Sequence, residues 1–313
     1  MLDLKLLTTF REVAVRGSFS DAAAALDFTQ PAVSQHISRL EAILGTRVLE
    51  RNARGVTLTP AGEVLARRAS ELLEAARRTE REVREAAGIG RARVRVAAFN
   101  SAAAGLLPGA TRELRARRPD AELTLQVMND APGIDALLAG RVDIAMFVQS
   151  PRSPALPRPG VEHVPIFDDE LRVAVAADHR LATRTSVTLE ELREEPWLIM
   201  EMDGTHGDSD VVAGAFRTAG YEPNVSFESE DYQALQGMAA SGIGVALIPT
   251  VALVSSRSDV VVLPLRGHVP ARQIVAAVRS GEDDPLVEHM IESMRVAARR
   301  LAVPPEPLRA SDT

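Results

Sequence analysis

The chain has 313 residues, a formal net charge of −7 and no cysteine. The missing cysteine excludes disulfides, thiol nucleophiles, cysteine-ligated zinc and iron–sulfur clusters. The acidic balance argues against a nucleic-acid-binding surface over the whole chain, because affinity for DNA depends on neutralising phosphates. The length indicates about two domains.

Three helical segments at the start of the chain have the spacing of a helix-turn-helix. The first is amphipathic and ends at Gly17; its apolar positions are Leu4, Leu7, Phe10 and Val13. Ser18 is the candidate N-cap of the second helix. The three-residue turn 27–29 leads into a third helix, which Thr29 caps and Gly45 ends.

The third helix presents a face that suits the major groove of DNA. At ~100° per residue, one stripe is apolar and consists of Val33, Ile37, Leu40 and Leu44. The opposite face carries no acid and consists of Pro31, Ser34, Gln35, Ser38 and Ala42, with Arg39 on its flank. Glutamine can bond adenine there, and arginine can bond guanine. The alternative is an ordinary solvated helix face, which is usually richer in glutamate and lysine.

Two short strands are expected after the third helix, over residues 47–51 and 55–59. They enclose a basic tip with Arg51 and Arg54. Such a hairpin is a wing suited to contact with phosphates or the minor groove.

Together these segments resemble the winged helix-turn-helix of LysR-type transcriptional regulators. The matching strings include Gly17-Ser18-Phe19-Ser20, Thr29-Gln30-Pro31-Ala32-Val33-Ser34 and Leu58-Thr59-Pro60-Ala61-Gly62. The resemblance implies base contacts by Gln30, Pro31, Ser34, Gln35 and Arg39. It implies phosphate contacts by Ser18, Ser20, Arg51 and Thr59, which Arg54 joins at the tip of the wing. Family members often carry arginine at the position of Gln35, so no base preference is transferred there.

Residues 60–87 are predicted to form one long helix, which Thr59 caps and a glycine pair at 88–90 ends. Small and apolar side chains recur at alternating steps of four and three residues, which is a coiled-coil spacing. The expected dimerisation residues are Leu65, Ala69, Leu72, Ala76 and Val83. In the resembled family this helix pairs two DNA-binding modules. The alternative is a helix packed on its own domain.

From residue 91 the pattern alternates strand and helix, which predicts an α/β domain with a mostly parallel sheet. No catalytic or metal-binding constellation emerges from this part of the sequence. The six histidines form no close metal pair. Lys5 is the one lysine, so neither a phosphate-binding Walker loop nor a Schiff-base lysine is possible in this domain. We therefore expect no enzyme activity, no cofactor and no metal.

Residues 91–300 resemble the effector-binding half of LysR-type regulators, which is similar to type 2 periplasmic binding proteins with two lobes around a cleft. The supporting strings include Leu138-Ala-Gly140-Arg-Val-Asp143-Ile-Ala145 and Glu195-Pro196-Trp197. Cleft residues are expected at strand ends and helix starts; the candidates are Ser101, Asn129, Gln149, Glu201, Thr205 and His206. Ser101 is also expected to cap the helix that follows it. Acids in the same loops weaken the case for a carboxylate ligand and leave cationic or neutral ligands open: Asp130, Glu201, Asp203, Asp208 and Asp210.

The predicted fold class is α/β multi-domain. A winged helix-turn-helix takes residues 1–59, a dimerisation helix and hinge take 60–90, and an effector-binding domain takes 91–302. Within that domain, lobe I takes about 91–162 and 269–302, and lobe II takes about 163–268. Residues 303–313 are expected to form a disordered tail.

The leading interpretation is a sequence-specific transcriptional regulator modulated by a small-molecule effector bound between two lobes. Its expected partners are double-stranded DNA, the effector and a second copy of itself, as a homodimer or a dimer of dimers. One alternative is a regulator of the same fold that acts without a ligand. Another is a small-molecule binding protein or enzyme with an accessory DNA-binding-like module.

The start of the chain lacks an export signal, and the uncharged stretch 232–256 is broken by Pro249. A cytoplasmic protein without a membrane partner is therefore expected. The charge distribution removes the objection to DNA binding, because residues 1–69 carry nine basic and seven acidic side chains and the remainder holds −9. Within the resembled family, the absence of cysteine excludes the thiol-switch peroxide sensors and favours non-covalent ligand sensing.

Overall fold

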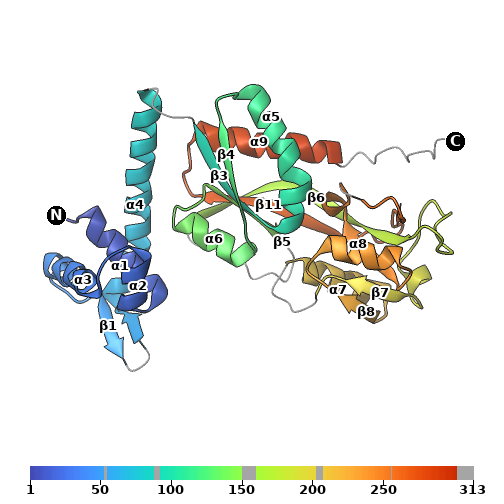
Figure 1. Ribbon diagram of the computed structural model, residues 1–313, viewed down its shortest axis with the longest axis horizontal. Helices are drawn as coiled ribbons and strands as arrows, with labels where there is room; N and C mark the ends of the chain where they lie inside the picture. Colours follow the sequence, from blue (N-terminus) through green and yellow to red (C-terminus); the bar gives the residue numbers. More distant parts are fainter. Residues whose placement is uncertain (53–54, 88–91, 150–159, 202–206, 255, 302–313) are drawn as a thin grey trace. The chain divides into compact units, whose positions relative to one another are not determined.

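The computed structural model describes residues 1–52, 55–87, 92–149, 160–201, 207–254 and 256–301. Contacts divide the chain into two compact units, Met1–Gly90 and Arg91–Thr313 (Figure 1). The predicted tail 303–313 and the glycine pair at 88–90 lie outside the described residues.

The N-terminal unit contains a helix-turn-helix, a hairpin and one long helix. Its elements are α1 (Leu4–Arg16), α2 (Phe19–Ala25), α3 (Gln30–Leu44), β1 (Leu49–Asn52), β2 (Gly55–Leu58) and α4 (Pro60–Ala86). Gly17 and Gly45 end α1 and α3 in the left-handed conformation, with φ of 63° and 68°. The Thr29 hydroxyl caps α3 by accepting a hydrogen bond from the Ala32 N–H at 3.4 Å. These helix limits agree with the signals in the sequence.

The first lobe of the C-terminal unit is a sheet covered by helices on both faces (Figure 1). Its strand order is β4 (Glu122–Val127), β3 (Arg93–Ala98), β5 (Ile144–Gln149), β11 (Ala271–Arg279) and the first part of β6 (Val161–Ala176). One face packs against a π-helical segment and two helices: η1 (Ala102–Leu106), α5 (Leu107–Arg117) and α9 (Pro285–Leu301). The other face packs against α6 (Asp130–Leu138).

The second lobe repeats this arrangement. It contains the rest of β6 with β10 (Val260–Leu263), β9 (Val245–Pro249), β7 (Pro196–Ile199) and β8 (Asn224–Glu228). Helix α7 (Gly207–Ala219) packs on one face, where Trp197 meets Phe216 with ring centroids 4.8 Å apart. Helix α8 (Tyr232–Ala240) packs on the other face. Two short 3-10 turns, η2 (Glu190–Leu192) and η3 (Thr250–Leu253), complete the lobe.

The long strand β6 belongs to both lobes, and the sheet pairing corrects two expectations. Strands within each lobe are parallel, but β6 and β11 run antiparallel to their neighbours, since a chain that crosses twice must return. The sheet is therefore mixed rather than mostly parallel. Residues 161–170 of β6 pair with β11, and pairing with β9 begins at Leu171. The first crossing thus lies at residues 170–171 and not near 163.

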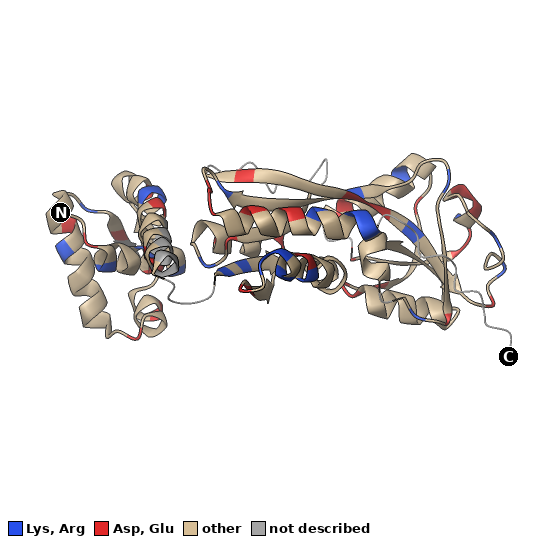
Figure 2. Cartoon of the chain, turned by 90° about the horizontal axis from the view of Figure 1, so that it is seen from above, with Lys and Arg blue, Asp and Glu red and all other residues tan. Residues whose placement is uncertain are grey.

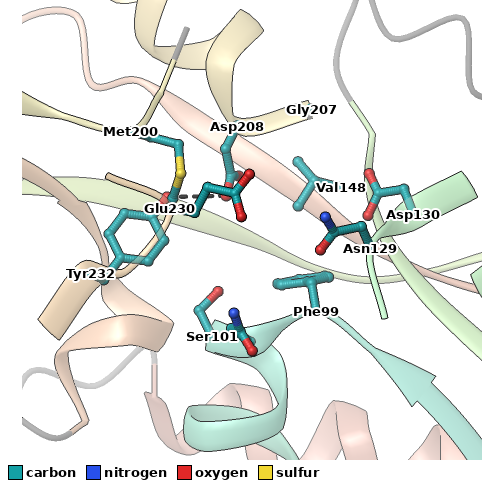
Figure 3. A pocket seen from close by; sticks show the side chains of 11 residues that line it. Phe99, Ser101, Asn129, Asp130, Val148, Met200, Gly207, Asp208, Glu230 and Tyr232 are labelled. Atoms are coloured by element: carbon teal, nitrogen blue, oxygen red, sulfur yellow. Dashed lines mark hydrogen bonds between the residues drawn. The ribbon is translucent and has the colours of Figure 1, made fainter. Parts of the chain in front are cut away.

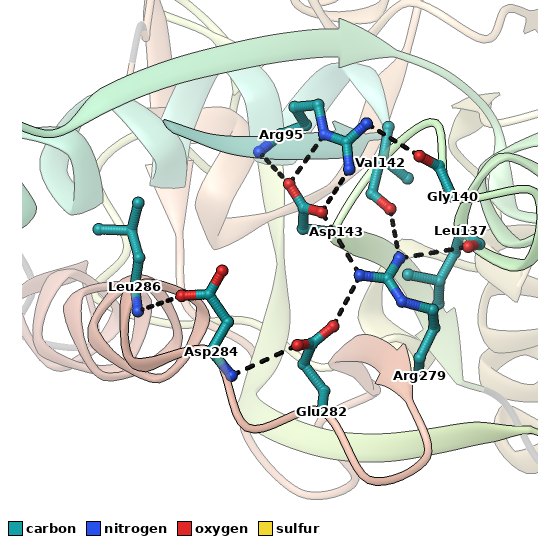
Figure 4. A network of polar contacts seen from close by, with 9 residues as sticks. All are labelled: Arg95, Leu137, Gly140, Val142, Asp143, Arg279, Glu282, Asp284 and Leu286. Atoms are coloured by element: carbon teal, nitrogen blue, oxygen red, sulfur yellow. Dashed lines mark hydrogen bonds and ion pairs between the residues drawn. The ribbon is translucent and has the colours of Figure 1, made fainter. Parts of the chain in front are cut away.

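A buried carboxylate anchors the first lobe (Figure 4). Asp143 is 3% exposed and accepts hydrogen bonds from the Arg95 backbone N–H at 2.9 Å and from its guanidinium at 2.6 Å. Arg279 contacts the same carboxylate at 3.4 Å and donates to the Val142 carbonyl at 2.8 Å. Burial alone would raise the pKa of Asp143, but the two guanidinium groups outweigh it and hold the pKa below its usual value. The motif around Asp143 is therefore structural.

Charges on the last helix follow the helix dipole. Glu288 and Glu292 lie in the first half of α9, and its arginines lie in the second half (Figure 2). Anionic side chains are favoured near a helix N-terminus and cationic ones near its C-terminus. The Arg295 guanidinium also donates to the Pro165 carbonyl at 3.2 Å, which fastens α9 to β6.

Candidate functional site

The outward face of α3 presents most of the residues predicted to contact bases. Those exposed to solvent are Gln30, Pro31, Gln35 and Arg39. Ser34 is half-buried. The one acid of α3, Glu41, turns away from this face, because its Oε1 accepts the Val48 and Leu49 N–H groups at 2.9 and 3.3 Å. The exposed face is thus polar, cationic at Arg39 and free of carboxylates.

A contact that the sequence did not reveal holds α3 against α1. The His36 ring nitrogen Nδ1 lies 2.9 Å from the Thr9 hydroxyl, which is buried at 0% exposure. The His36 ring also meets Phe28 edge-on at 5.4 Å. A histidine and a threonine 27 residues apart give no local signal. The pair fixes the orientation of the α3 face.

The wing is tied to the end of α1. Strands β1 and β2 pair antiparallel, as predicted, and the Val56 N–H donates to the Gly17 carbonyl at 2.9 Å. Gly55 has φ of 125°, and a Cβ there would lie 2.8 Å from that same carbonyl oxygen, so only glycine fits. The Arg51 side chain and Arg54 lie outside what the structure describes.

Among the predicted phosphate contacts, Ser20 is exposed and Ser18 is half-buried. The Ser18 hydroxyl accepts the Asp21 N–H at 3.2 Å and so caps α2. Thr59 is wrong as a phosphate contact, because it is 8% exposed and its hydroxyl is already used. That hydroxyl donates to the Arg47 carbonyl at 2.9 Å and accepts the Gly62 N–H at 3.0 Å. Thr59 is the cap of α4.

The residues of α4 that were predicted to contact a second copy fall into two groups. Leu65 and Ala69 are 8% and 0% exposed within the core of their own unit, so their assignment to a dimer contact is wrong. Leu73 joins them in this core. Leu72 and Val83 are 44% and 62% exposed, and Ala76 is half-buried. The physical reason is that α4 begins inside the N-terminal unit, where α1 needs an apolar cover.

A cavity of about 50 Å³ lies between the two lobes of the C-terminal unit (Figure 3). The first lobe contributes Phe99, Asn100, Ser101, Asn129, Asp130 and Val148. The second lobe contributes Met200, Gly207, Asp208, Glu230 and Tyr232. Both lobes therefore meet whatever enters it.

Two of the residues predicted for the cleft, Ser101 and Asn129, line this cavity. Gln149 and Glu201 are exposed and do not line it, so their positions at strand ends were misleading. Thr205 and His206 lie outside the described residues. The aromatic and sulfur-bearing wall residues, Phe99, Met200 and Tyr232, gave no recognisable pattern in the sequence, because they come from three separate segments.

A buried arginine lies directly beneath the cavity. Arg272 of β11 is 1% exposed and forms an ion pair with Asp169 of β6, which is 0% exposed, at 2.9 Å. Its Nη1 donates to both carboxylate oxygens of Asp208 at 2.8 and 2.7 Å. Its Nη2 donates to the Ser101 hydroxyl at 3.0 Å. Ser101 makes no cap to its own helix, so that expectation is wrong.

This arrangement fixes the charges around the arginine. Burial alone would lower the pKa of Arg272, but Asp208 and Asp169 outweigh it and raise that pKa, so the guanidinium remains a cation. Burial raises the pKa of Asp169, and Arg272 opposes that rise. The Tyr232 hydroxyl donates to Asp208 at 3.0 Å. Burial and Asp208 hold the pKa of Tyr232 well above its usual value, so the hydroxyl keeps its proton.

In the described residues no group of three or more histidines and acids could hold a metal ion. No described helix is long and apolar enough to cross a membrane.

Comparison with known proteins decides the family. Residues 4–63 match the bacterial regulatory helix-turn-helix proteins of the lysR family, and residues 87–299 match the LysR substrate binding domain. The chain belongs to the LysR family of transcriptional regulators. LysR members are DNA-binding regulators with an effector-binding domain, which confirms the leading interpretation and the predicted fold class.

Relatives and solved structures span nearly the whole chain. The transcriptional regulator MetR of Salmonella typhimurium is 31% identical over 297 residues, covering 94% of this chain and 90% of that protein. AlsR of Bacillus subtilis is 28% identical over 302 residues, covering 93% and 94%. Full-length OxyR from Pseudomonas aeruginosa superposes with a TM-score of 0.70 at 26% identity, covering 95% of each chain. CbnR, solved with its target DNA, gives a TM-score of 0.61 at 26% identity, covering 95% and 100%.

Proposed function

We propose that this LysR-type regulator reads its operator with the exposed face of α3. The observation that carries this proposal is a helix face with Gln35 and Arg39 exposed and its one acid turned to the wing. Amide and guanidinium groups make the commonest base-specific contacts in the major groove. Gln30 and Pro31 lie at the start of the same helix, and Ser34 lies between them and Arg39. Ser20 and the wing arginines Arg51 and Arg54 contact phosphates beside it.

Two copies bind together through α4. The supporting observation is that Leu72 and Val83 stay exposed on a helix of 27 residues, with Ala76 between them. Small and apolar residues on such a face let a second helix approach closely. Pairing matters for affinity, because the net charge of +2 in residues 1–69 gives one module only weak attraction to DNA.

A small effector occupies the cavity between the lobes and changes their relative arrangement. It can shift the equilibrium between two lobe arrangements only by as much as its affinities for those arrangements differ. The alternative, a regulator without a ligand, is favoured by one observation. Arg272 already joins the lobes through Ser101 and Asp208. The protein acts in the cytoplasm and by binding rather than by catalysis.

Footprinting on the DNA upstream of its own gene tests the proposal. The wild type should protect two half-sites and lose affinity as salt rises. Gln35→Ala should change base preference, whereas Arg39→Ala should cost about 1–3 kcal/mol of binding free energy if it reads a guanine. Arg217→Ala, an exposed arginine of α7, is the matched control and should bind like the wild type. Binding without sequence preference would contradict the proposal.

A further inference from the structure

Helix α7 of the second lobe begins directly against the first lobe. Its first residue is Gly207, which is buried. A Cβ at this position would lie 2.4 Å from the carbonyl oxygen of Val148, which belongs to β5 of the first lobe. No side chain fits there without displacing that carbonyl, so glycine permits the close approach of the two backbones. The lobes therefore touch at the start of α7.

The next residue of α7 joins the lobes by an ion pair. Both carboxylate oxygens of Asp208 accept hydrogen bonds from Arg272 Nη1, at 2.8 and 2.7 Å. Arg272 lies on β11 of the first lobe and is 1% exposed. Tyr232 of α8 supports the contact from the second lobe, because its hydroxyl donates to Asp208 at 3.0 Å and its ring centre lies 5.8 Å from the Arg272 guanidinium.

Arg272 is held by its own lobe and is not free to follow Asp208. Its Nε donates to Asp169 of β6 at 2.9 Å, and its Nη2 donates to the Ser101 hydroxyl at 3.0 Å. Its guanidinium also lies 5.3 Å from the ring centre of Phe99. All three partners belong to the first lobe. A separation of the lobes would therefore break the contact with Asp208 and leave the other contacts of Arg272 in place.

Such a separation leaves no buried charge without a partner. The Asp208 side chain is 12% exposed and lines the cavity, so it would pass into water as α7 moved away. Asp169 is 0% exposed and would keep Arg272 as its cation. Breaking a buried ion pair is most costly when one charge stays buried and uncompensated. The contact of Arg272 with Asp208 can therefore open and close, whereas its contact with Asp169 is a fixed part of the first lobe.

We propose that Asp208 and Arg272 form a latch that holds the two lobes closed before any effector binds. Domains with two lobes generally close around a ligand that contacts both of them. Here the guanidinium of Arg272 makes the bridge from within the chain. This inference rests on the proposed function and deepens it, since it names what sets the arrangement of the lobes in the regulator without its effector.

A distance measured between the lobes tests the latch. The chain has no cysteine, so two introduced cysteines are the only sites for a spin label. Glu194→Cys places one in the second lobe and Glu288→Cys places the other on α9 of the first lobe; both positions are exposed. Double electron–electron resonance on the full-length protein, diluted with unlabelled protein, records the distance within one chain. Without ligand or DNA, the labelled protein with its latch intact should give one distance.

Two substitutions at Asp208 should open the latch. Asp208→Asn keeps the size of the side chain and removes its charge, and it should raise the ratio of open to closed protein by about tenfold or more, since hydrogen bonds to charged groups are of that strength. A second distance should then become measurable. Asp208→Lys places a cation opposite Arg272, and the second distance should predominate, because like charges repel across an interface.

The matched control removes an ion pair that lies within one lobe. Asp259→Asn loses the contact of Asp259 with Arg257, which is also 2.7 Å long and belongs to the second lobe alone. Its distance distribution should coincide with that of the protein with an intact latch. The fluorescence of the buried Trp197 during unfolding in urea shows whether each variant is folded.

Two results would overturn the inference: two well-populated distances while Asp208 is intact, or an unchanged distribution in a folded Asp208 variant. Operator footprinting of the protein without introduced cysteines separates this failure from a failure of the proposed function. A protein that protects its operator but shows no latch is still a DNA-binding regulator. A protein that shows no sequence-preferring protection contradicts the proposed function instead.

Discussion

Replacing Arg272 with methionine should destabilise the C-terminal unit by several kcal/mol. The side chain is 1% exposed, and its removal leaves the Asp169 carboxylate, at 0% exposure, without its cation. Removing one partner of a buried ion pair costs about 3–5 kcal/mol, because the other charge stays buried. Asp208 adds less to this cost, since its side chain is 12% exposed and keeps some contact with water. For a unit of this size the melting temperature should fall by about 10 °C.

The single tryptophan makes this measurement specific. Trp197 is 0% exposed in the core of the second lobe, so its fluorescence follows unfolding of the C-terminal unit in urea. The matched control is Arg257→Met, which removes an exposed arginine that pairs with Asp259 at 2.7 Å. Its unfolding curve should coincide with that of the wild type.

A double variant tests whether the unpaired charge of Asp169 causes this loss of stability. If the uncompensated Asp169 charge causes the loss, then adding Asp169→Asn to Arg272→Met should recover at least about 1 kcal/mol. Asparagine keeps an oxygen that can accept the Val251 N–H, which Asp169 now accepts at 3.0 Å. A loss below about 1 kcal/mol in Arg272→Met, or simple addition of the two losses, would refute the account.

Three further predictions concern the buried carboxylate Asp143, the helix cap Thr59 and the exposed Leu72 of α4. Since the pKa of Asp143 is lowered in the folded state, its stabilisation is present above the unfolded pKa of about 4 and is lost as pH falls through the folded pKa. Asp143→Asn should therefore be less stable than the wild type at pH 7. Between pH 5 and 3 the variant should lose less stability than the wild type does, as measured by urea titration; equal pH profiles would contradict this. Thr59→Val should cost about 1 kcal/mol through the lost cap of α4, measured by thermal melting of helical circular dichroism, and an unchanged melting curve would disprove the cap. Leu72→Asp should reduce the molar mass measured by light scattering, whereas Val15→Asp, at a more exposed apolar position on α1, should not; equal masses would place the dimer contact elsewhere.

The N-terminal unit was predictable because its signals are short-ranged. Gly17 and Gly45 end helices through backbone conformations that only the nearest residues influence, and Thr29 caps its own helix three residues ahead. The same periodicity rule failed on α4. Leu65 and Val83 share one coiled-coil pattern, yet only the first meets α1 and becomes core. Periodicity shows which face is apolar and does not show which partner covers it.

The cavity was only partly predictable because its contacts join distant parts of the chain. Ser101 satisfies the local rule for a helix cap, but its hydroxyl accepts a hydrogen bond from Arg272, 171 residues later. Asp169 stands between Asp168 and Glu170 in the sequence, where nothing local indicates burial, yet it is 0% exposed and pairs with the same arginine. The pairing of distant strands brings both Ser101 and Asp169 to Arg272. No local pattern in the sequence indicates that pairing.

The ion pair between Arg272 and Asp169 lies beside the point where β6 passes from the first lobe to the second. Arg272 and Asp169 are register partners on β11 and β6, and Asp169 lies two residues before Leu171, where β6 leaves the first lobe. The Leu171 N–H donates to the Pro270 carbonyl at 2.9 Å, so β6 is joined there to the residue that precedes β11. Asp208 belongs both to the cavity wall and to this network. Asp208 therefore connects the cavity wall and helix α7 to β6 at the point where this strand passes from one lobe to the other.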